Sequence, residues 1–265
     1  METYVTLGVE VDGPVLNLVL HRPERRNAIN DAMVGELAAV FAAAAERPGV
    51  RVVVLSGAGP VFCAGADLES MRAAAASSHD DNVASALRLA DTLAAVGGCP
   101  LPVVARVHGA AMGGGAGLVA AADIAVAADS TRFAFSEVRL GLIPAVISPF
   151  VLPRIGLAAT TELFLTGETF GADRAQAVGL VAAVVPEAEL DQAVAERVAA
   201  LLEGAPGAQG AAKALIRRVL REPAGARSFT AEAIAHRRAS AEGQEGMAAF
   251  FDRRPPFWRP PRQDG

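Results

Sequence analysis

Apolar runs recur along the first two thirds of the chain and predict buried strands. The run 52–55 is unbroken and 101–107 is almost as apolar, as in strands covered on both faces. The segments 4–10 and 15–20 flank Asp12-Gly13-Pro14, which predicts a hairpin at the start of the chain. Shorter apolar stretches predict further extended segments at 124–128, 132–135 and 179–186.

Apolar positions repeat at helical spacing between these strands. The clearest case is 32–46, where Met33, Leu37 and Val40 would share one face. Residues 73–82 are small and polar, and we expect a mobile segment there. The same spacing predicts helices over 83–96, 118–122, 160–165, 173–177, 190–202, 210–220, 228–240 and 243–251.

Strands and helices alternate as far as Pro186, and only helical patterns follow it. The sequence therefore predicts an α/β protein whose chain divides, without a clear linker, near Pro186. We expect a core over residues 1–186 and a helical module over residues 187–265.

Composition narrows the class of protein. The 265 residues are 52% hydrophobic and 20% charged, which excludes a disordered chain. A net charge of −5 without a basic block argues against a nucleic-acid partner. Neither a secretory signal nor a membrane-spanning run is visible, so a membrane is not an expected partner. Cys63 and Cys99 match no metal or redox spacing, and we expect a cytoplasmic protein.

A glycine-rich stretch at 108–118 separates the strand at 101–107 from the next apolar helix. Gly113, Gly114 and Gly115 let the backbone approach a ligand, and their N–H groups lie at the positive end of a helix. Such a turn can hold a phosphate or the oxyanion of an activated carbonyl. The structural alternative is close packing that requires small residues.

A second glycine-rich turn, at 57–68, also joins a strand to a helix. The position and spacing of the glycines do not fit a dinucleotide site, and the chain has no P-loop or nucleophile-elbow motif. What remains is two sets of backbone donors, around Ala66 and Gly114. If both converge on one oxygen, they form an oxyanion hole suited to a thioester enolate.

Glu137 is the carboxylate in the most distinctive setting, close in sequence to Phe133 and Phe135. Burial raises the pKa of a carboxyl group, which suits proton transfer near neutrality. The ordinary alternative is a carboxylate at a helix start that pairs with Arg132 or Arg139. No cluster of histidines and carboxylates indicates a metal site, and we expect none.

Taken together, these motifs resemble the crotonase superfamily of enoyl-CoA hydratases and isomerases. The resemblance covers almost the whole chain. It implies a spiral of ββα units, with C-terminal helices that mediate a homotrimer or a hexamer of two trimers. It also implies an acyl-CoA substrate and no cofactor, because coenzyme A is part of the substrate. The segments that carry it are 62–68, 108–115, 123–127, 135–137, 141–144, 165–168 and 175–180.

The same resemblance assigns roles to individual residues. The N–H groups of Ala66 and Gly114 would hold the thioester oxygen, and Glu137 would be the acid/base. Arg25 or Arg26 would approach the phosphates of coenzyme A. The implied binding residues are Arg26, Ala28, Ala64, Gly65, Ala66, Asp67, Leu68 and Gly114.

One position departs from the standard hydratases, which carry a glutamate where this chain has Gly117. A second glutamate of those enzymes matches Glu137, so the acid/base chemistry depends on Glu137 unless another acid, such as Glu69, takes part. The run 136–149 is similar to bacterial hydratases of branched or carboxylated enoyl-CoAs, of the methylglutaconyl-CoA hydratase type. For a distal carboxylate the sequence offers three candidate partners, Arg72, His79 and Arg139.

Three functions follow from these residues. The first is hydration of a 2-enoyl-CoA through an enolate held in the oxyanion hole. The second is double-bond isomerisation with Glu137 as the only acid/base, since one carboxylate suffices to move a proton between carbons. The third is acyl-CoA binding without catalysis, which the presence of Glu137 disfavours.

Overall fold

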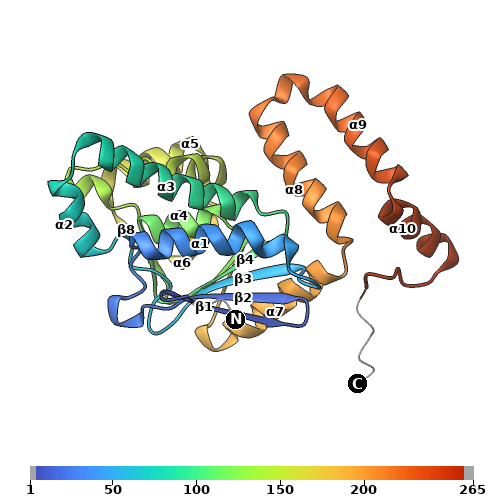
Figure 1. Cartoon of the computed structure of the whole chain (residues 1–265), viewed down its shortest axis with the longest axis horizontal. Helices are drawn as coiled ribbons and strands as arrows, with labels where there is room; N and C mark the ends of the chain where they lie inside the picture. Colours follow the sequence, from blue (N-terminus) through green and yellow to red (C-terminus); the bar gives the residue numbers. More distant parts are fainter. Residues whose placement is uncertain (1–3, 260–265) are drawn as a thin grey trace.

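A six-stranded sheet forms the centre of the computed structural model, which describes residues 4–259 (Figure 1). The strand order is β1-β2-β3-β4-β6-β9; β1 is antiparallel to β2, and all other neighbours are parallel. The expected hairpin and the longer apolar runs are thus strands of one sheet. Their bounds are β1 (Leu7–Asp12), β2 (Val15–Leu20), β3 (Val52–Gly57), β4 (Val103–Val107), β6 (Ile124–Ala128) and β9 (Ala183–Val185).

A second sheet contains three short strands in the order β5-β7-β8. Isolated bridges from Ile29 to Ala66 and from Cys63 to Ala111 extend this pairing towards the N-terminus. Successive units therefore leave the large sheet, form a short extended segment and enter a helix, which gives the expected spiral of ββα units. The three strands are β5 (Ala110–Met112), β7 (Arg132–Ala134) and β8 (Thr169–Gly171).

Helices cover both faces of the large sheet (Figure 1). In β3, Val53 and Leu55 belong to the main core, whereas Val52 and Val54 pack with residues of α7. The unbroken apolar run thus has the physical cause that the sequence indicated, burial on both faces. The helices up to this point are α1 (Asp31–Ala43), α2 (Leu68–Ala76), α3 (His79–Gly98), α4 (Gly114–Ala121), α5 (Ser148–Thr166), α6 (Ala172–Ala177) and α7 (Leu190–Leu202).

Several segments differ from the expectation drawn from the sequence. Residues 73–82 are largely helical, because alanines favour the end of α2 and the Ser78 side chain caps α3 by accepting from the Asp81 N–H. The helix expected at 118–122 begins at Gly114, so the glycine run forms its first turns. Glycine disfavours a helix in isolation, and only close packing makes it suitable here. The strands β5 and β8 were not expected, because three residues show no period.

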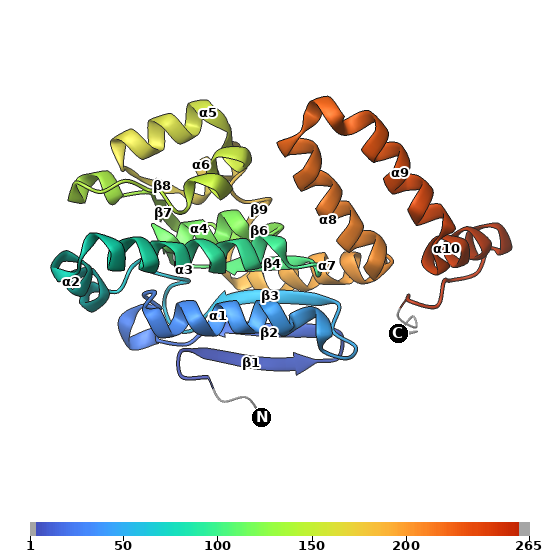
Figure 2. The ribbon, with the colours of Figure 1, turned by 45° about the horizontal axis from the view of Figure 1, so that its top comes forward.

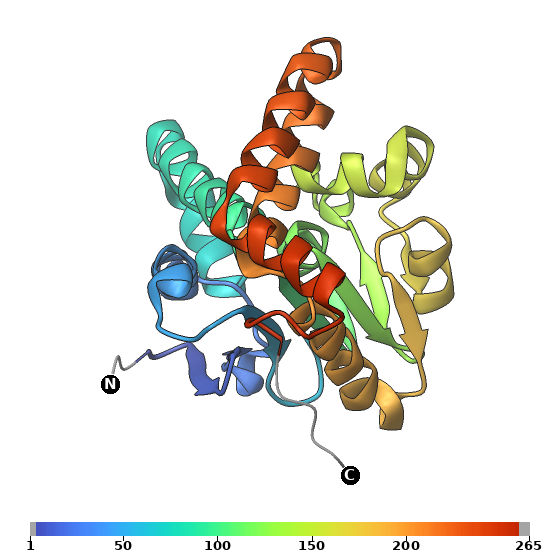
Figure 3. The same ribbon diagram turned by 90° about the vertical axis from the view of Figure 1, so that its right-hand side faces the viewer.

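Three C-terminal helices project from the core (Figure 2). Two side chains on the first of them dock it: Lys213 Nζ donates to the Leu101 carbonyl oxygen at 2.8 Å, and Arg217 donates to the Gly97 carbonyl oxygen at 2.6 Å. Figure 3 shows the last two of these helices in front of the core. Their bounds are α8 (Pro206–Arg221), α9 (Ala226–Ala239) and α10 (Ala241–Asp252).

The expected division between 1–186 and 187–265 falls just before α7. This helix packs on the core sheet through Leu190, Val194 and Val198, whereas α8 to α10 extend away from it. The division stays a prediction, and residues 260–265 of the expected module lie outside the described residues.

Candidate active site

A cavity of about 350 Å³ brings the two glycine-rich turns and Glu137 together. Ala66, Gly114 and Glu137 all line it. The start of α1 forms one wall, α2 and α3 form a second, and the segment 142–147 forms a third. The structure thus unites three elements that are widely separated in sequence, and the surrounding wall is mostly apolar.

The Ala66 amide is free to face the cavity because of its place in a parallel bridge. The Ile29 N–H donates to the Gly65 carbonyl oxygen at 2.7 Å, and the Asp67 N–H donates to the Ile29 carbonyl oxygen at 2.9 Å. In a parallel pair the intervening residue directs its own N–H to the opposite side. Within residues 4–259, the Ala66 amide accordingly donates to no protein oxygen.

The Gly114 amide is the first N–H of α4, and the first N–H groups of a helix have no partner within it. The preceding Gly113 has φ +47°, and its own N–H donates to the Ala134 carbonyl oxygen at 2.9 Å. Residues with a Cβ rarely adopt this backbone conformation. Gly113 therefore turns the chain so that the amide of Gly114 opens to the cavity.

Glu137 begins a short 3-10 helix after β7, and its carboxyl group lies beside Gly113. A Cβ on Gly113 would lie 3.1 Å from Glu137 Oε1, so the glycine makes room for the carboxylate. Glu137 Oε2 is buried without a hydrogen-bond partner, and burial raises the pKa of this carboxyl above its ordinary value. In the described part of the chain it forms no ion pair with Arg132 or Arg139, so the pairing alternative is wrong.

The remaining expected binding residues lie around the turn rather than in the cavity wall. The Ala28 carbonyl oxygen accepts from Arg22, and the Ala64 N–H donates to the Arg26 carbonyl oxygen. Asp67 is buried and paired with Arg22, whereas Leu68 is exposed at the start of α2. The side chains of Arg25 and Arg26 are exposed near the same turn.

Gly117 does not line the cavity, because the side chain of Ile147 lies between Gly117 and the cavity. A Cβ on Gly117 would lie only 2.3 Å from Ile147 Cγ2, and Ile147 itself lines the cavity. The place expected for a second acid is thus closed by an aliphatic side chain. Glu69 does not replace that acid: it lies outside the cavity wall and pairs with Arg25 at 3.2 Å on the surface.

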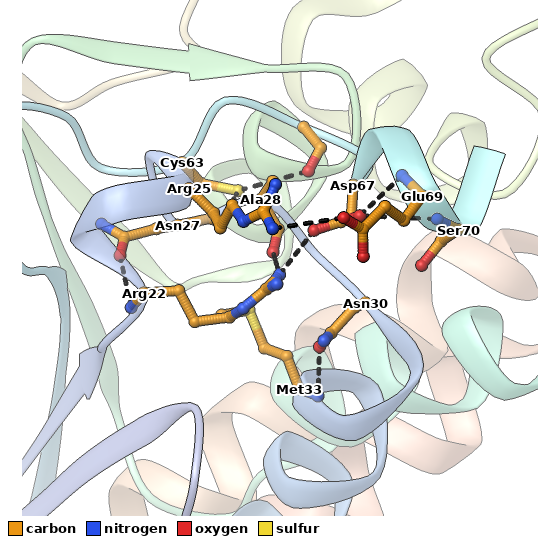
Figure 4. Close-up of polar contacts among 11 residues, drawn as sticks. Arg22, Arg25, Asn27, Ala28, Asn30, Met33, Cys63, Asp67, Glu69 and Ser70 are labelled. Carbon is orange, nitrogen blue, oxygen red and sulfur yellow. Dashed lines mark hydrogen bonds and ion pairs between the residues drawn. The ribbon is translucent and has the colours of Figure 1, made fainter. Parts of the chain in front are cut away.

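Sequence reasoning missed two residues that hold the site, Arg22 and Asn27 (Figure 4). Asn27 has φ +52°, and its side-chain amide donates to the carbonyl oxygens of Ala58, Val61 and Phe62. Arg22 bonds to Ala28 and Asp67. The only feature of the sequence that pointed to these two residues was their place in a polar loop between a strand and a helix.

In the part of the chain that the structure describes, the cavity wall also lacks the cationic partner that a distal carboxylate would need. Among the described residues that line it, Asp31 and Glu137 carry charge and none is lysine, arginine or histidine. Arg72, His79 and Arg139, the candidate partners for a distal carboxylate, are not part of the wall.

Residues 4–259 contain neither a metal-binding cluster nor a membrane-spanning helix. No group of three or more His, Cys, Asp or Glu side chains is placed to hold a metal ion. No helix in this range has the length and apolar character needed to cross a membrane.

The fold, the paired amides and the buried carboxylate define an acyl-CoA enzyme of the crotonase type, and comparison with known proteins agrees. The family model for enoyl-CoA hydratase/isomerase matches residues 10–261, and the chain belongs to this family.

Several proteins described as enoyl-CoA hydratases are similar to this chain over nearly their full length. A Rhodobacter capsulatus protein named "Probable enoyl-CoA hydratase" is 36% identical over 97% of this chain and 98% of its own. The solved enoyl-CoA hydratase of Shewanella pealeana has a TM-score of 0.92 at 35% identity, covering 96% of each chain. That of Mycobacterium smegmatis has a TM-score of 0.91 at 34% identity, covering 96% of this chain and 99% of its own. The crotonase fold expected from the sequence is confirmed.

Proposed function

We propose that this protein is an enoyl-CoA hydratase, a hydro-lyase that adds water across a 2-enoyl thioester. The observation that carries the proposal is the single cavity lined by Ala66, Gly114 and Glu137. Two unpartnered amides suit an oxygen that gains negative charge, and a buried carboxylate suits proton transfer beside it.

The reaction needs no group beyond these. Ionised Glu137 takes a proton from water as the water oxygen bonds to the β-carbon. The electrons of the double bond move to the thioester oxygen, where the amides of Ala66 and Gly114 stabilise the enolate. The α-carbon then takes the proton from Glu137, and the carboxylate is restored. We accordingly propose a reaction without a metal or other cofactor, in which coenzyme A is part of the substrate.

We propose an uncharged acyl chain, linear or branched. The wall offers no cation to a distal carboxylate, and the ionised carboxyl of Glu137 would repel one. Of the two chain types that the sequence left open, branched and carboxylated, the charge of the wall supports the branched one. We propose that the coenzyme A part lies along the exposed turn of Arg25 or Arg26 and residues 64–68.

A second candidate is double-bond isomerisation in the same cavity. The observation that favours it is Ile147 beside Gly117, which fills the place where a second carboxylate was expected. A single carboxylate can remove a proton from one carbon and return it to another. The third function, binding without turnover, gives no role to the buried, unpaired carboxyl of Glu137.

The deciding experiment is turnover in water labelled with heavy oxygen. The panel contains crotonyl-CoA, 3-methylcrotonyl-CoA and 3-methylglutaconyl-CoA, with a 3-enoyl-CoA to detect isomerisation. We expect label in the 3-hydroxyacyl product, and better turnover of the uncharged thioesters than of the carboxylated one. Movement of the double bond without label would support the isomerase, and no reaction with any thioester would contradict both.

We also propose a homotrimer, or a hexamer of two trimers, in the cytoplasm. Large apolar side chains are exposed on the projecting helices, which supports contact with further copies of the chain. Cys63 and Cys99 are both free and buried, which fits a reducing compartment.

A further inference from the structure

The turn that carries Ala66 is tied to a second loop by a largely buried ion pair (Figure 4). Arg22 Nη1 donates to Asp67 Oδ2 at 2.9 Å and to the Ala28 carbonyl oxygen at 2.6 Å. The side chains of Arg22 and Asp67 are only 15% and 5% exposed. One guanidinium group thus contacts both segments that form the bridge presenting the Ala66 amide.

Asp67 also interacts with the start of α2, on the other side of the turn. Its Oδ1 accepts from the Glu69 N–H at 2.8 Å and from the Ser70 N–H at 3.4 Å, which caps α2. Burial acts to raise the pKa of Asp67, but these hydrogen bonds and Arg22 outweigh it, and the pKa stays below its usual value. The carboxylate is therefore held ionised, with one oxygen on the helix and the other on Arg22.

The backbone on both sides of Ala66 is fixed by the same contacts. The bonds from Ile29 to Gly65 and from Asp67 to Ile29 set the direction of the Ala66 N–H. Ala28 and Asp67, the two groups bound by Arg22, each adjoin a member of this bridge. A change in the ion pair would thus move the bridge that aims the amide.

We propose that Arg22 and Asp67 are positioning residues that aim the Ala66 amide at the thioester oxygen. They act through the bridge to Ile29 and do not touch the acyl thioester group, since neither lines the cavity. The inference rests on the proposed function only in taking an acyl thioester as the ligand. A donor aimed at a developing negative charge loses effect when it is displaced slightly, which gives the ion pair a role beyond stability.

The test measures the carbonyl directly. Butyryl-CoA, labelled with heavy carbon at the thioester carbonyl, has no double bond to hydrate and can be observed bound by infrared difference spectroscopy. In the native protein we expect the stretching frequency to fall on binding, because two amides polarise the bond. In Asp67→Asn and Arg22→Met we expect about half of this fall to remain, since one of two donors is misaligned.

The matched control is Glu69→Gln, which removes the exposed ion pair with Arg25 between the same two segments. We expect it to keep the native carbonyl shift. Asp67→Asn retains an oxygen that can cap α2, so it separates a lost ion pair from a lost helix start, and circular dichroism verifies that each variant is folded. On an unsaturated substrate, the two variants should lower kcat more than they raise KM.

The outcomes separate this inference from the proposed function. A native carbonyl shift in both folded variants overturns the positioning role and leaves the hydratase standing. A reduced shift in the variants, in a protein that hydrates no enoyl-CoA, supports the positioning role and overturns the proposed function. An unshifted carbonyl in the native protein, or no binding of butyryl-CoA, overturns the positioning role, and turnover of the enoyl-CoAs then decides the proposed function on its own.

Discussion

Glu137 has the environment that a proton-transferring carboxylate requires, with one oxygen buried and unpaired and the other beside a glycine. Ala66 and Gly114, which line the same cavity, would contribute only their backbone amides to the proposed oxyanion hole. At the scale of single residues, the site therefore depends on polar groups that have no partner and on a glycine that has no side chain. Gly113 illustrates this, because a Cβ there would press on Glu137 Oε1 at 3.1 Å.

Replacing the carboxyl of Glu137 with an amide tests its role. In Glu137→Gln we expect kcat to fall by about 10²–10⁴-fold, the usual contribution of a general acid/base. Burial raises the pKa of the native carboxyl, and a base must be ionised. The native kcat/KM should therefore decline with falling pH at a higher pH than an exposed glutamate would give. Glu69→Gln is the control and should keep the native profile; unchanged turnover in Glu137→Gln would refute the assignment.

The contact between Gly117 and Ile147 can be tested by a double-mutant cycle. Gly117→Ala should destabilise the fold by roughly 1–3 kcal/mol, because its Cβ would lie 2.3 Å from Ile147 Cγ2. Ile147→Ala should cost about 2–5 kcal/mol by leaving a cavity. The double variant should lose less than the sum of the two, since the truncated side chain leaves room for the new methyl group. Urea unfolding of the four proteins measures the coupling.

Gly35→Ala is the control for helix propensity. Gly35 lies within α1 with nothing within 4 Å of an added Cβ, so this change should stabilise the fold by about 0.5–1 kcal/mol. Additive losses in the cycle would show that Ile147 does not fill the place beside Gly117.

At the scale of elements, the docking of α8 connects the projecting helices to the core. Lys213 Nζ bonds to the Leu101 carbonyl oxygen and to Asp123, and the same Asp123 oxygen accepts from the Val103 N–H at 2.7 Å. These contacts join α8 to the ends of β4 and β6. Lys213, the only lysine of the chain, thus holds α8 on the core. The sequence alone gave no indication of this role.

Removing this ammonium group should loosen α8. In Lys213→Met we expect the free energy of unfolding to fall by roughly 1–3 kcal/mol, because Asp123 and the Leu101 carbonyl lose a charged donor that is only 10% exposed. Limited proteolysis should also cut sooner between α7 and α8. Arg174→Met, which breaks an exposed ion pair with Glu162, should cost less than about 1 kcal/mol. Equal losses in the two variants would contradict the docking role.

At the scale of the whole molecule, the last three helices bury few large side chains within one copy of the chain. Figure 2 shows them extending beyond the core, and the exposed apolar side chains lie along all three. An isolated monomer rarely leaves such a surface in water. The exposed residues are Ile216, Leu220, Ile234, Met247, Phe250 and Phe251.

Light scattering should therefore give three or six times the monomer mass. Phe250→Asp should lower this mass without unfolding the core, because Phe250 is 79% exposed in the single chain and a charge would be buried at the contact. Val11→Asp, an exposed apolar position on β1, is the control and should retain the native mass. A monomer of the native protein at micromolar concentration would contradict the proposed assembly.

The local pattern of hydrophobic residues was enough to predict the longer strands and most helices. Burial of one or both faces of such an element produces a recognisable spacing of apolar residues in the sequence. The local pattern also singled out the two glycine-rich turns and Glu137. It was insufficient for the helical segment at 73–82 and for the short strands of the second sheet. There, caps and pairing partners decide the structure, and three residues show no period.

The sequence by itself determined the alternation of strands and helices, the absence of a local metal or nucleotide motif, and the residues capable of acid/base and oxyanion chemistry. Only the tertiary structure decided that Ala66 and Gly114 share one cavity, and that Ile147 closes the place beside Gly117. It also decided that Arg22 reaches Asp67, 45 residues away. The physical reason is that such contacts depend on how strands pair and helices pack, which no stretch of neighbouring residues encodes on its own.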